Sequence, residues 1–328
     1  MATILVTGGA GYVGSHACKL LKARGHAPVA FDDLSTGWED AVLFGPLHKG
    51  DLLDRAALDA AFEAHRPDAV MHFAAKSLVG ESVQNPAKYW RNNVVGSMNL
   101  LDAMRAHGVD AFVFSSTCAI FGDQGEAVLT ETTAKAPASP YGASKLAVES
   151  MLDDYCAAGA LRATAFRYFN VAGADPEGEI GERHDPETHL IPLVLQAASG
   201  EREAISVFGS DYPTPDGTCI RDYIHVVDLI EAHILGIEAL LGGAEGGRYN
   251  LGTGHGYSVR EVIEEARRVT GRTITVREAD RRPGDPAKLV SGGTLAAETF
   301  GWRAQKGLPE MIADAWAFFE ARRAQSAA

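Results

Sequence analysis

The sequence predicts an α/β fold: a Rossmann-like doubly wound parallel sheet with a smaller α/β lobe at the C-terminal end. Three observations favour this fold. Short β-branched apolar runs alternate with helical patterns six times before residue 172, an order typical of a parallel sheet covered by helices. A glycine-rich turn at residues 8–14 joins the first run to the first helical pattern. After Ala174 the pattern changes to short strands, loops rich in glycine and proline, and isolated helices.

This change of pattern predicts two domains. We expect one at residues 1–172 and one at 173–328, with the chain near 225–252 packing back onto the first. The domains would then meet along a cleft to which both contribute.

The composition excludes several classes of protein. With 46% hydrophobic and 22% charged residues, the 328-residue chain is typical of a globular protein. Its net charge of −13 argues against a nucleic-acid partner, which would require a basic surface. The four cysteines are scattered without a Cys-x-x-Cys pair, so we expect neither a disulfide framework nor a cysteine-based zinc site, and we assign no metal ligands. No signal segment opens the chain and no apolar run reaches the ~20 residues that span a bilayer, so we expect a cytoplasmic location and no membrane partner.

The first predicted strand, residues 3–7, runs directly into a glycine motif. Gly8, Gly11 and Gly14 are spaced three residues apart, and a helical pattern follows them. Glycines in this strand–turn–helix context allow a tight turn and close approach of the backbone to a pyrophosphate, which binds at the helix N-terminus. The motif therefore predicts a dinucleotide site.

The second predicted strand, residues 28–31, ends at Asp32 and Asp33. Asp32 lies 18 positions after Gly14, where an acidic residue suits a hydrogen bond to an adenosine ribose 2′-hydroxyl. The same carboxylate would repel a 2′-phosphate, so NAD is favoured over NADP. A loop carboxylate with no ligand is the alternative interpretation.

Further strands and helices continue the alternation. Hydroxyl residues 115–117 follow the fifth predicted strand and so lie at the edge of the sheet where ligands bind. Asn93 falls inside a long predicted helix, where asparagine is unfavourable unless it is hydrogen-bonded. It is therefore a candidate for a structural or cofactor-side role, with a solvated polar helix face as the alternative. We expect strands at residues 47–49, 68–73, 111–114, 162–168, 205–208 and 249–251, and helices at 55–65, 86–107, 141–157, 190–198, 224–241, 259–270 and 309–322.

Tyr141 and Lys145 lie four residues apart in a helical pattern that Pro140 can begin. On a helix this spacing places both side chains on one face. An unperturbed tyrosine has a pKa of about 10, and a neighbouring ammonium favours the phenolate and lowers that pKa. The pair could therefore act as an acid–base group at neutral pH. An amphipathic helix that carries both residues by chance is the alternative interpretation.

Several segments together resemble one family. They are TGGAGYVG at residues 7–14, HFAA at 72–75, VGESV at 79–83, NNV at 92–94, RYFNVAGA at 167–174, DYPTPDGTCIRDYIHVVDL at 211–229 and YNLGTG at 249–254. Over essentially its whole length the chain is similar to the UDP-glucose 4-epimerases (UDP-galactose 4-epimerases), which belong to the extended short-chain dehydrogenase/reductase family.

The resemblance implies an NAD-dependent epimerisation at C4 of a UDP-hexose, from UDP-galactose to UDP-glucose, and a place in galactose metabolism. Tyr141 would take the proton of the sugar 4-hydroxyl while hydride moves from C4 to NAD, and Thr117 would hydrogen-bond the sugar O4. The transient 4-keto sugar would turn over and take the hydride back, so NAD would stay tightly held. The implied cofactor contacts are Gly8, Gly11, Tyr12, Val13, Gly14, Asp32, Asp33, Asp51, Leu52, Phe73, Ala74, Ala75, Lys76, Asn93, Ser115, Tyr141, Lys145 and Phe169.

The resemblance also implies contacts with a UDP-sugar, most of them in the C-terminal lobe. Some relatives carry a lysine after the position of Lys76, where this chain has Ser77, and an asparagine at the position of His189, so the roles of Lys76 and His189 stay open. Leu289 occupies the position beside the sugar 2-substituent and is intermediate in size. The implied substrate contacts are Thr117, Asn170, His189, Leu190, Ser206, Phe208, Arg221, Arg282, Asp285 and Leu289.

Other activities and an assembly state follow from the same resemblance. UDP-pentose (arabinose or xylose) and UDP-N-acetylhexosamine 4-epimerases are alternatives, and a net sugar-nucleotide dehydrogenase or reductase is a further one. A 4,6-dehydratase of this fold carries Asp-Glu after the threonine, whereas Thr117 is followed here by Cys118 and Ala119. An NAD-sensing protein typically lacks the tyrosine or the lysine. The helices at 92–107 and 141–157 resemble the family's dimer-forming pair, so we expect a homodimer.

Overall fold

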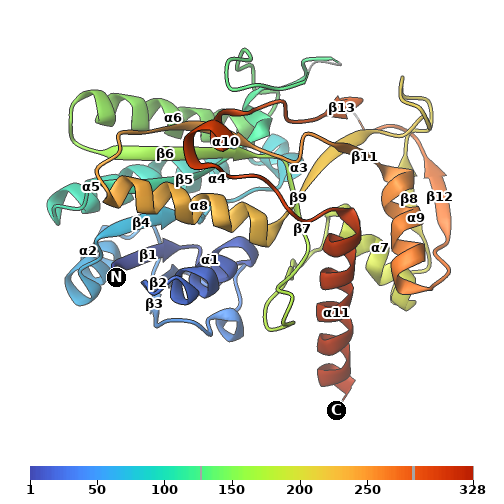
Figure 1. Cartoon of the computed structure of the whole chain (residues 1–328), viewed down its shortest axis with the longest axis horizontal. Coiled ribbons are helices and arrows are strands. Elements are labelled where there is room, and N and C mark those ends of the chain that lie inside the picture. Colours follow the sequence, from blue (N-terminus) through green and yellow to red (C-terminus); the bar gives the residue numbers. More distant parts are fainter. Residues whose placement is uncertain (126–127, 283–284, 328) are drawn as a thin grey trace. The chain divides into compact units, whose positions relative to one another are not determined.

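The structure, a computed structural model, describes residues 1–125, 128–282 and 285–327 (Figure 1). The chain divides into two compact units, and each consists of several segments. Unit 1 comprises Met1–Asp123, Glu131–Arg167 and Ile230–Asn250, and unit 2 comprises Gln124–Thr130, Tyr168–Leu229 and Leu251–Ala328.

The sheet of unit 1 has seven strands in the order β10-β6-β5-β4-β1-β2-β3. The pairs of β1 with β2, β1 with β4, β4 with β5, and β2 with β3 are all parallel. The chain therefore winds outward from β1 in both directions, which makes the sheet doubly wound. The strands are β1 Thr3–Thr7, β2 Ala27–Asp32, β3 Leu47–Lys49, β4 Ala69–His72, β5 Ala111–Thr117, β6 Arg162–Tyr168 and β10 Gly246–Leu251.

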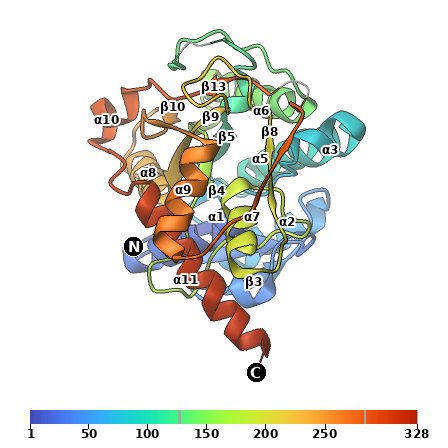
Figure 2. The ribbon, with the colours of Figure 1, turned by 90° about the vertical axis from the view of Figure 1, so that its right-hand side faces the viewer.

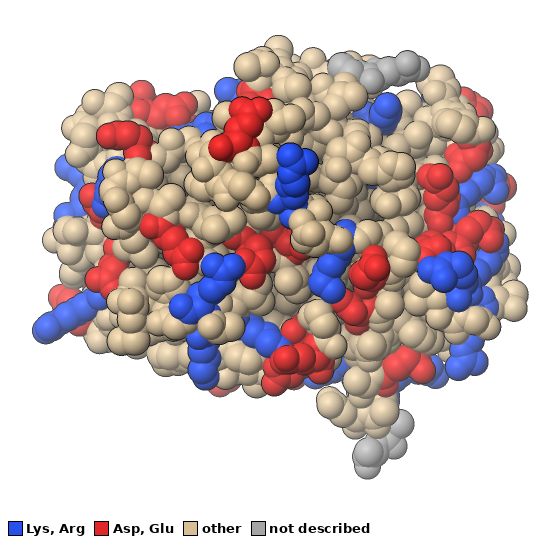
Figure 3. All heavy atoms as spheres, viewed as in Figure 1, with Lys and Arg blue, Asp and Glu red and all other residues tan. Residues whose placement is uncertain are grey.

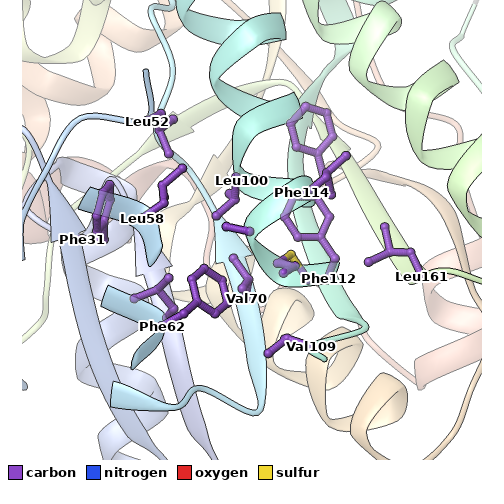
Figure 4. Packing of buried hydrophobic residues seen from close by; sticks show 14 of the residues in the cluster. Phe31, Leu52, Leu58, Phe62, Val70, Leu100, Val109, Phe112, Phe114 and Leu161 are labelled. Atoms are coloured by element: carbon purple, nitrogen blue, oxygen red, sulfur yellow. The ribbon is translucent and has the colours of Figure 1, made fainter. Parts of the chain in front are cut away.

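The longer helices cover this sheet because they bury apolar residues against it. Figure 4 shows this packing, with Phe31 from β2, Leu58 from α2, Val70 from β4, Leu100 from α5 and Phe112 from β5 in one buried cluster. The helices of unit 1 are α1 Tyr12–Ala23, η1 Glu39–Ala41, α2 Arg55–His65, α3 Val79–Gln84, α4 Pro86–Tyr89, η2 Trp90–Val95, α5 Gly96–Ala106, η3 Cys118–Ile120, α6 Pro140–Ala157 and most of α8 Val226–Leu241.

Unit 2 combines small sheets with helices. Strand β9 lies at the centre of its four-stranded sheet, between β11 and β13, and also pairs with β7. The helices α7, α9 and α11 pack on one another and are seen together in Figure 2. The elements are β7 Asn170–Ala172, α7 Leu190–Ser199, β8 Ile205–Phe208, β9 Ile220–His225, β11 Gly256–Ser258, α9 Val259–Thr270, β12 Val276–Ala279, β13 Lys288–Leu289, α10 Leu295–Phe300 and α11 Leu308–Ala327.

Three sequence predictions differ from the structure. The fifth strand, predicted at 111–114, continues to Thr117, so residues 115–117 lie inside β5 and do not follow it. The helix predicted at 86–107 is helical throughout, but residues 90–95 form the π-helical turn η2 between α4 and α5. The helix predicted at 224–241 begins only at Val226, because Tyr223, Ile224 and His225 pair with β7 as the end of strand β9. An apolar run that ends a strand and begins a helix gives no sign of the boundary in its pattern.

For several other elements the predicted bounds are confirmed. The bounds of β1, β3, β6, β8, α2 and α9 are those predicted, and the strand predicted at 249–251 is the end of β10, which lies beside β6. On the face shown in Figure 3 the basic and acidic side chains are interspersed. Among the described residues, no helix has the length and apolar character needed to cross a membrane.

Candidate active site

The glycine turn of unit 1 has room for glycine alone at three positions, Gly8, Gly9 and Gly14. Gly8 has φ +74°, and a Cβ there would lie 2.7 Å from the backbone nitrogen of Ala74. A Cβ on Gly14 would lie 2.1 Å from the Gly8 carbonyl oxygen. Contacts this short are far inside van der Waals distance, so a side chain at Gly8 would collide with the chain after β4, and one at Gly14 would push α1 away from the turn. The turn therefore brings bare backbone to the start of α1.

The N-terminus of α1 suits an anion. Its N-cap is Gly11, which offers no side-chain cap, and the first turn, formed by Tyr12, Val13 and Gly14, contains no acidic residue. The N–H groups at a helix start carry the positive end of the helix dipole and bind phosphate well. These residues therefore fit the pyrophosphate of a dinucleotide.

Asp32 lies at the end of β2, where its carboxylate is buried and organises the turn around it. Oδ2 accepts a hydrogen bond from the Ala10 nitrogen at 3.0 Å, and Oδ1 accepts one from the Leu34 nitrogen at 2.9 Å. Burial raises the pKa of Asp32, although these hydrogen bonds oppose the rise. Each carboxylate oxygen retains a second lone pair, so Asp32 can also accept from a ribose hydroxyl.

The neighbouring candidates are more exposed. Asp33 accepts from the Ser35 nitrogen and Asp51 from the Leu53 nitrogen, so both carboxylates close local turns. Lys76 Nζ donates to Ser35 Oγ at 2.6 Å. The structure thus places Lys76 at the loop that follows Asp33.

Tyr141 and Lys145 lie in the first two turns of α6. The helix begins where Ser139 Oγ accepts from the Gly142 nitrogen at 3.2 Å, with Pro140 in the first turn. Tyr141 is half-buried, and its ring meets the edge of the Tyr89 ring at a centroid distance of 6.5 Å.

Lys145 is buried, with 3% of its surface exposed. Its Nζ donates to the Ser115 carbonyl at 2.8 Å and lies 4.8 Å from the centre of the Phe114 ring. Burial lowers its pKa to about 7, against the opposing effect of Glu149. The ammonium and amine forms are therefore close in free energy at neutral pH, and a neighbouring negative charge would favour the ammonium.

A buried ion pair connects α6 to the strands beside it. Arg167, at the end of β6, donates through Nη2 to Glu149 Oε2 at 2.6 Å and through Nε to Glu149 Oε1 at 2.9 Å. Ser116 Oγ donates to the same Oε1 at 2.5 Å. Glu149 lies four residues after Lys145, and Ser116 precedes the candidate Thr117, whose Oγ1 accepts from the Ala119 nitrogen. The pair therefore fixes the end of β5 against the helix that carries Tyr141.

Asn93 is buried, so the interpretation as a solvated polar helix face is wrong. Its Oδ1 accepts from the Lys76 nitrogen at 2.9 Å, and its Nδ2 donates to the Lys76 carbonyl at 3.0 Å and to Ser144 Oγ at 3.1 Å. Its own carbonyl accepts from Ser97 Oγ at 2.5 Å, and that hydroxyl lies 2.9 Å from His72 Nε2. Asn93 thus connects the chain after β4 to the catalytic-candidate helix α6.

The remaining cofactor candidates are spread over several elements of the two units. Phe73 and Ala74 donate backbone hydrogen bonds to the Thr7 carbonyl at 3.0 and 3.1 Å, which holds the segment after β4, including Ala75, beside the glycine turn. Leu52 is buried in the core of unit 1. Ser115 lies in β5 of unit 1, and Phe169 is buried in unit 2.

In unit 2 the structure brings several substrate candidates together. Arg221 Nη2 donates to Asp285 Oδ1 at 3.0 Å, and Leu289 pairs with Arg221 across β13 and β9. The guanidinium of Arg282 lies 4.0 Å from the centre of the Phe208 ring, at the end of the strand that also carries Ser206. Two guanidinium groups and an aromatic face are thus held by one part of unit 2.

The other substrate candidates lie on different elements of unit 2. Asn170 begins β7 and pairs with Tyr223 of β9. His189 and Leu190 lie at the start of α7, and His189 Nδ1 is 2.9 Å from Glu182 Oε1. Burial lowers the pKa of His189, but the carboxylates near it outweigh burial and raise the pKa to about 10.

Sequence reasoning missed two groups of residues. Glu149 follows Tyr141 and Lys145 at the same four-residue spacing, which places it on the same helix face as they are, and this spacing was the available signal. Glu182 and His184 precede the assigned His189 by a few residues, and their density of ligand-type side chains was a signal as well. His72 belongs to neither group. Its Nδ1 lies 2.6 Å from Thr7 Oγ1, and burial lowers its pKa to about 3, so its imidazole is neutral in the core.

Residues 4–252 match the family model described as the NAD dependent epimerase/dehydratase family. The chain belongs to this family. The prediction of a Rossmann-like, NAD-dependent member of this family is therefore confirmed.

The chain is similar over almost its whole length to curated members of the family and to members whose structures are solved. A UDP-glucose 4-epimerase of Rhizobium leguminosarum bv. trifolii is 49% identical over 314 residues, which cover 96% of each chain. The crystal structure of the UDP-glucose 4-epimerase from Brucella ovis in complex with NAD is 49% identical, with a TM-score of 0.94 over 97% of this chain and 98% of that one. That of Stenotrophomonas maltophila, with bound NAD and formylated UDP-arabinopyranose, is 39% identical, with a TM-score of 0.96 over 99% and 100%.

Proposed function

We propose that this chain is a UDP-glucose 4-epimerase that converts UDP-galactose to UDP-glucose with a tightly held NAD. The observation that carries the proposal is the α6 arrangement, in which Tyr141 lies one turn from the buried, hydrogen-bonded ammonium of Lys145. The identity of 49% with a curated UDP-glucose 4-epimerase over 96% of both chains supports the specific reaction.

Unit 1 supplies the groups that would hold the cofactor. The bare glycine turn and the start of α1 would bind the pyrophosphate, and Asp32 would accept from the adenosine ribose. Lys145 would donate to the nicotinamide ribose, and Asn93 would act indirectly by fixing the backbone of Lys76. Bound NAD supplies a reversible hydride acceptor, which lets a C4 centre be oxidised and reduced again without a second substrate.

Tyr141 is the proposed acid–base group. Its phenolate would take the proton from the sugar 4-hydroxyl and return it at the end of the reaction. The Lys145 ammonium favours the Tyr141 phenolate, and the phenolate in turn favours the ammonium. Each group is therefore more often in its charged form when the other is charged. Thr117, fixed at the end of β5, would hydrogen-bond O4 and hold the reacting hydroxyl in place.

Unit 2 supplies the proposed UDP-sugar contacts. The guanidinium groups of Arg221 and Arg282 match the geometry of a diphosphate, and Asp285 would accept from the uridine ribose while it orients Arg221. The Phe208 ring, already stacked on Arg282, offers an apolar face to the uracil. Leu289 would limit the space beside the sugar 2-substituent.

A homodimer in the cytoplasm, acting in galactose metabolism, completes the proposal. Five large apolar side chains on α3, η2 and α5 are each at least 40% exposed, and a second copy of the chain would cover them. They are Val79, Val83, Trp90, Val95 and Met98.

Incubation of the purified protein with UDP-galactose and no added NAD tests the function. We expect conversion to UDP-glucose, loss of conversion in Tyr141→Phe by at least about 100-fold, and retained conversion in Tyr155→Phe. Tyr155 is a matched control because it lies on the same helix but donates to Asp102 Oδ1 at the far end.

Other products would indicate another sugar substrate or another reaction. Conversion of UDP-xylose or of UDP-N-acetylglucosamine, with UDP-galactose untouched, would keep the reaction and replace the sugar. Release of NADH with formation of an oxidised sugar would instead indicate a net dehydrogenase. Protein that holds NAD and converts none of these sugars would refute the epimerase function.

A further inference from the structure

Four metal-ligating side chains gather within eight residues of unit 2, before α7. They belong to Glu182, His184, Glu187 and His189, and none is needed for the proposed hydride chemistry. One possible ligand atom from each lies within 4.8 Å of every other. From this arrangement we propose that residues 182–189 form a binding site for a zinc-class divalent cation.

Each histidine of the cluster lies close to both carboxylates. His184 Nδ1 lies 3.1 Å from Glu182 Oε1 and 3.7 Å from Glu187 Oε2. His189 Nδ1 lies 2.9 Å from Glu182 Oε1 and 3.3 Å from Glu187 Oε1. Ligands at ~2.0–2.1 Å from a tetrahedral zinc ion are about 3.4 Å apart, so these four histidine–carboxylate distances lie in the range that such an ion requires.

The surroundings hold the carboxylates in place. The side chains of Glu182 and Glu187 are each only 8% exposed. Glu187 Oε1 accepts from the backbone nitrogens of Thr188 and His189 at 2.7 and 2.8 Å, which fixes its orientation. The buried Nδ1 of His184 approaches both carboxylates without a hydrogen bond of good geometry to either. A metal ion would give this nitrogen a well-directed partner.

The donor set selects the kind of cation. Two imidazole nitrogens and two carboxylate oxygens suit zinc and its neighbours among the transition metals. Magnesium and calcium prefer oxygen ligands alone, so they should bind weakly. The nearby group of Asp175, Glu177 and Glu179 has only carboxylates, two of them on exposed residues, and carries no proposal.

An ion pair cluster without metal is the competing explanation. Two protonated histidines would neutralise the two carboxylates, just as one divalent ion bound to neutral histidines would. Both arrangements are electrically balanced, so charge alone does not choose between them. The convergence of one ligand atom from each of the four side chains within 4.8 Å favours the metal, because ion pairs require only pairwise contact.

Metal loading of the full-length protein, prepared without a histidine tag and stripped with EDTA, tests the proposal. Titration calorimetry with zinc chloride should show one ion per chain, and elemental analysis after gel filtration should find it retained. His184→Gln and Glu187→Gln should each weaken binding by at least about tenfold. His255→Gln, which removes an exposed histidine outside the cluster, should leave binding unchanged.

Cobalt gives a readout that surface binding would not reproduce. Cobalt(II) added to the stripped protein should develop the intense visible absorption of a four-coordinate ion, and zinc should abolish it. Retained conversion of UDP-galactose in His184→Gln would show that this variant is folded. Absence of a stoichiometric zinc ion, or equal binding by wild type and both cluster variants, would overturn the proposal.

Discussion

At the residue scale, Lys145 combines a charged group with a buried position. Its ammonium donates to the Ser115 carbonyl and lies over the Phe114 ring, and burial lowers its pKa to about 7. Between about pH 7 and the ordinary lysine pKa of about 10.4, the unfolded chain binds a proton that the folded chain does not. The free energy of unfolding therefore rises with pH across this window.

Lys145→Met should separate stability from activity. With bound nucleotide removed, we expect the variant to be more stable than wild type by about 2 kcal/mol at pH 7, because the burial penalty of the charge exceeds the lost hydrogen bond. The difference should shrink as the pH approaches 10, and conversion of UDP-galactose should be lost. Urea unfolding at several pH values measures this. Lys22→Met, at an exposed position on α1, is the control, and a destabilised Lys145→Met at pH 7 would contradict the prediction.

Gly14→Ala should disturb the glycine turn. The new Cβ would lie 2.1 Å from the Gly8 carbonyl oxygen, which is backbone and cannot rotate away. We expect a loss of about 1–3 kcal/mol in the free energy of unfolding and a lower content of bound NAD, measured by absorbance after denaturation. Gly80→Ala is the matched control, since its Cβ meets nothing within 4 Å on α3. Full NAD content in Gly14→Ala would contradict this account of the turn.

Residue types could be predicted from sequence where the backbone context restricts them. Gly8 follows β1, Gly14 lies in the first turn of α1 and Asp32 ends β2, so their positions made them candidates. Glu149 and Arg167 could not be paired in this way, because their contact joins a helix to a strand whose packing no local pattern describes.

At the scale of elements, the Arg167–Glu149 pair connects β6 to α6, and Ser116 adds β5. Both side chains are at most 3% exposed. A buried charge that loses its partner is costly, whereas loss of both charges together can be nearly neutral.

Arg167→Met should therefore lower the free energy of unfolding by about 3–5 kcal/mol. The double variant Arg167→Met/Glu149→Met should recover much of that stability but not the rate of UDP-galactose conversion, because Ser116 loses its acceptor beside Thr117. Chemical unfolding of the two single variants and the double variant measures the coupling. Additive effects of the two substitutions would show that the pair does not act as a unit.

Element boundaries were less predictable than element types. Alternation of apolar runs and helical patterns located the strands of the parallel sheet. The π-helical turn η2 was not predicted, because it depends on Asn93 turning inward to the backbone of Lys76. The end of β9 depends on its pairing with β7, a contact between segments about 50 residues apart.

At the scale of the whole molecule, the proposed homodimer explains the exposed apolar side chains of α3, η2 and α5. Met98→Glu should convert the dimer to a monomer, since a charge buried in an apolar interface is unfavourable. Sedimentation velocity measures this. Leu295→Glu, at an exposed apolar position on α10 in unit 2, should remain dimeric. A monomeric wild-type protein would contradict the proposed assembly.

The fold class and family could be predicted from the sequence because their signals are local and repeated along the chain. For the proposed metal cluster the sequence offers only the density of ligand-type residues, because four such residues in a loop define a site only when the backbone turns them toward one point. His189 stays a predicted substrate contact, and its position beside two carboxylates could not be predicted from the sequence.

The central claim is that hydride leaves C4 and returns to it within one site. The most direct test incubates the protein, without added NAD, with UDP-galactose that carries deuterium at C4. We expect UDP-glucose with deuterium retained at C4, and no deuterium at C4 when unlabelled substrate reacts in D₂O. Loss of the label to solvent, or its appearance in released NADH, would contradict the account.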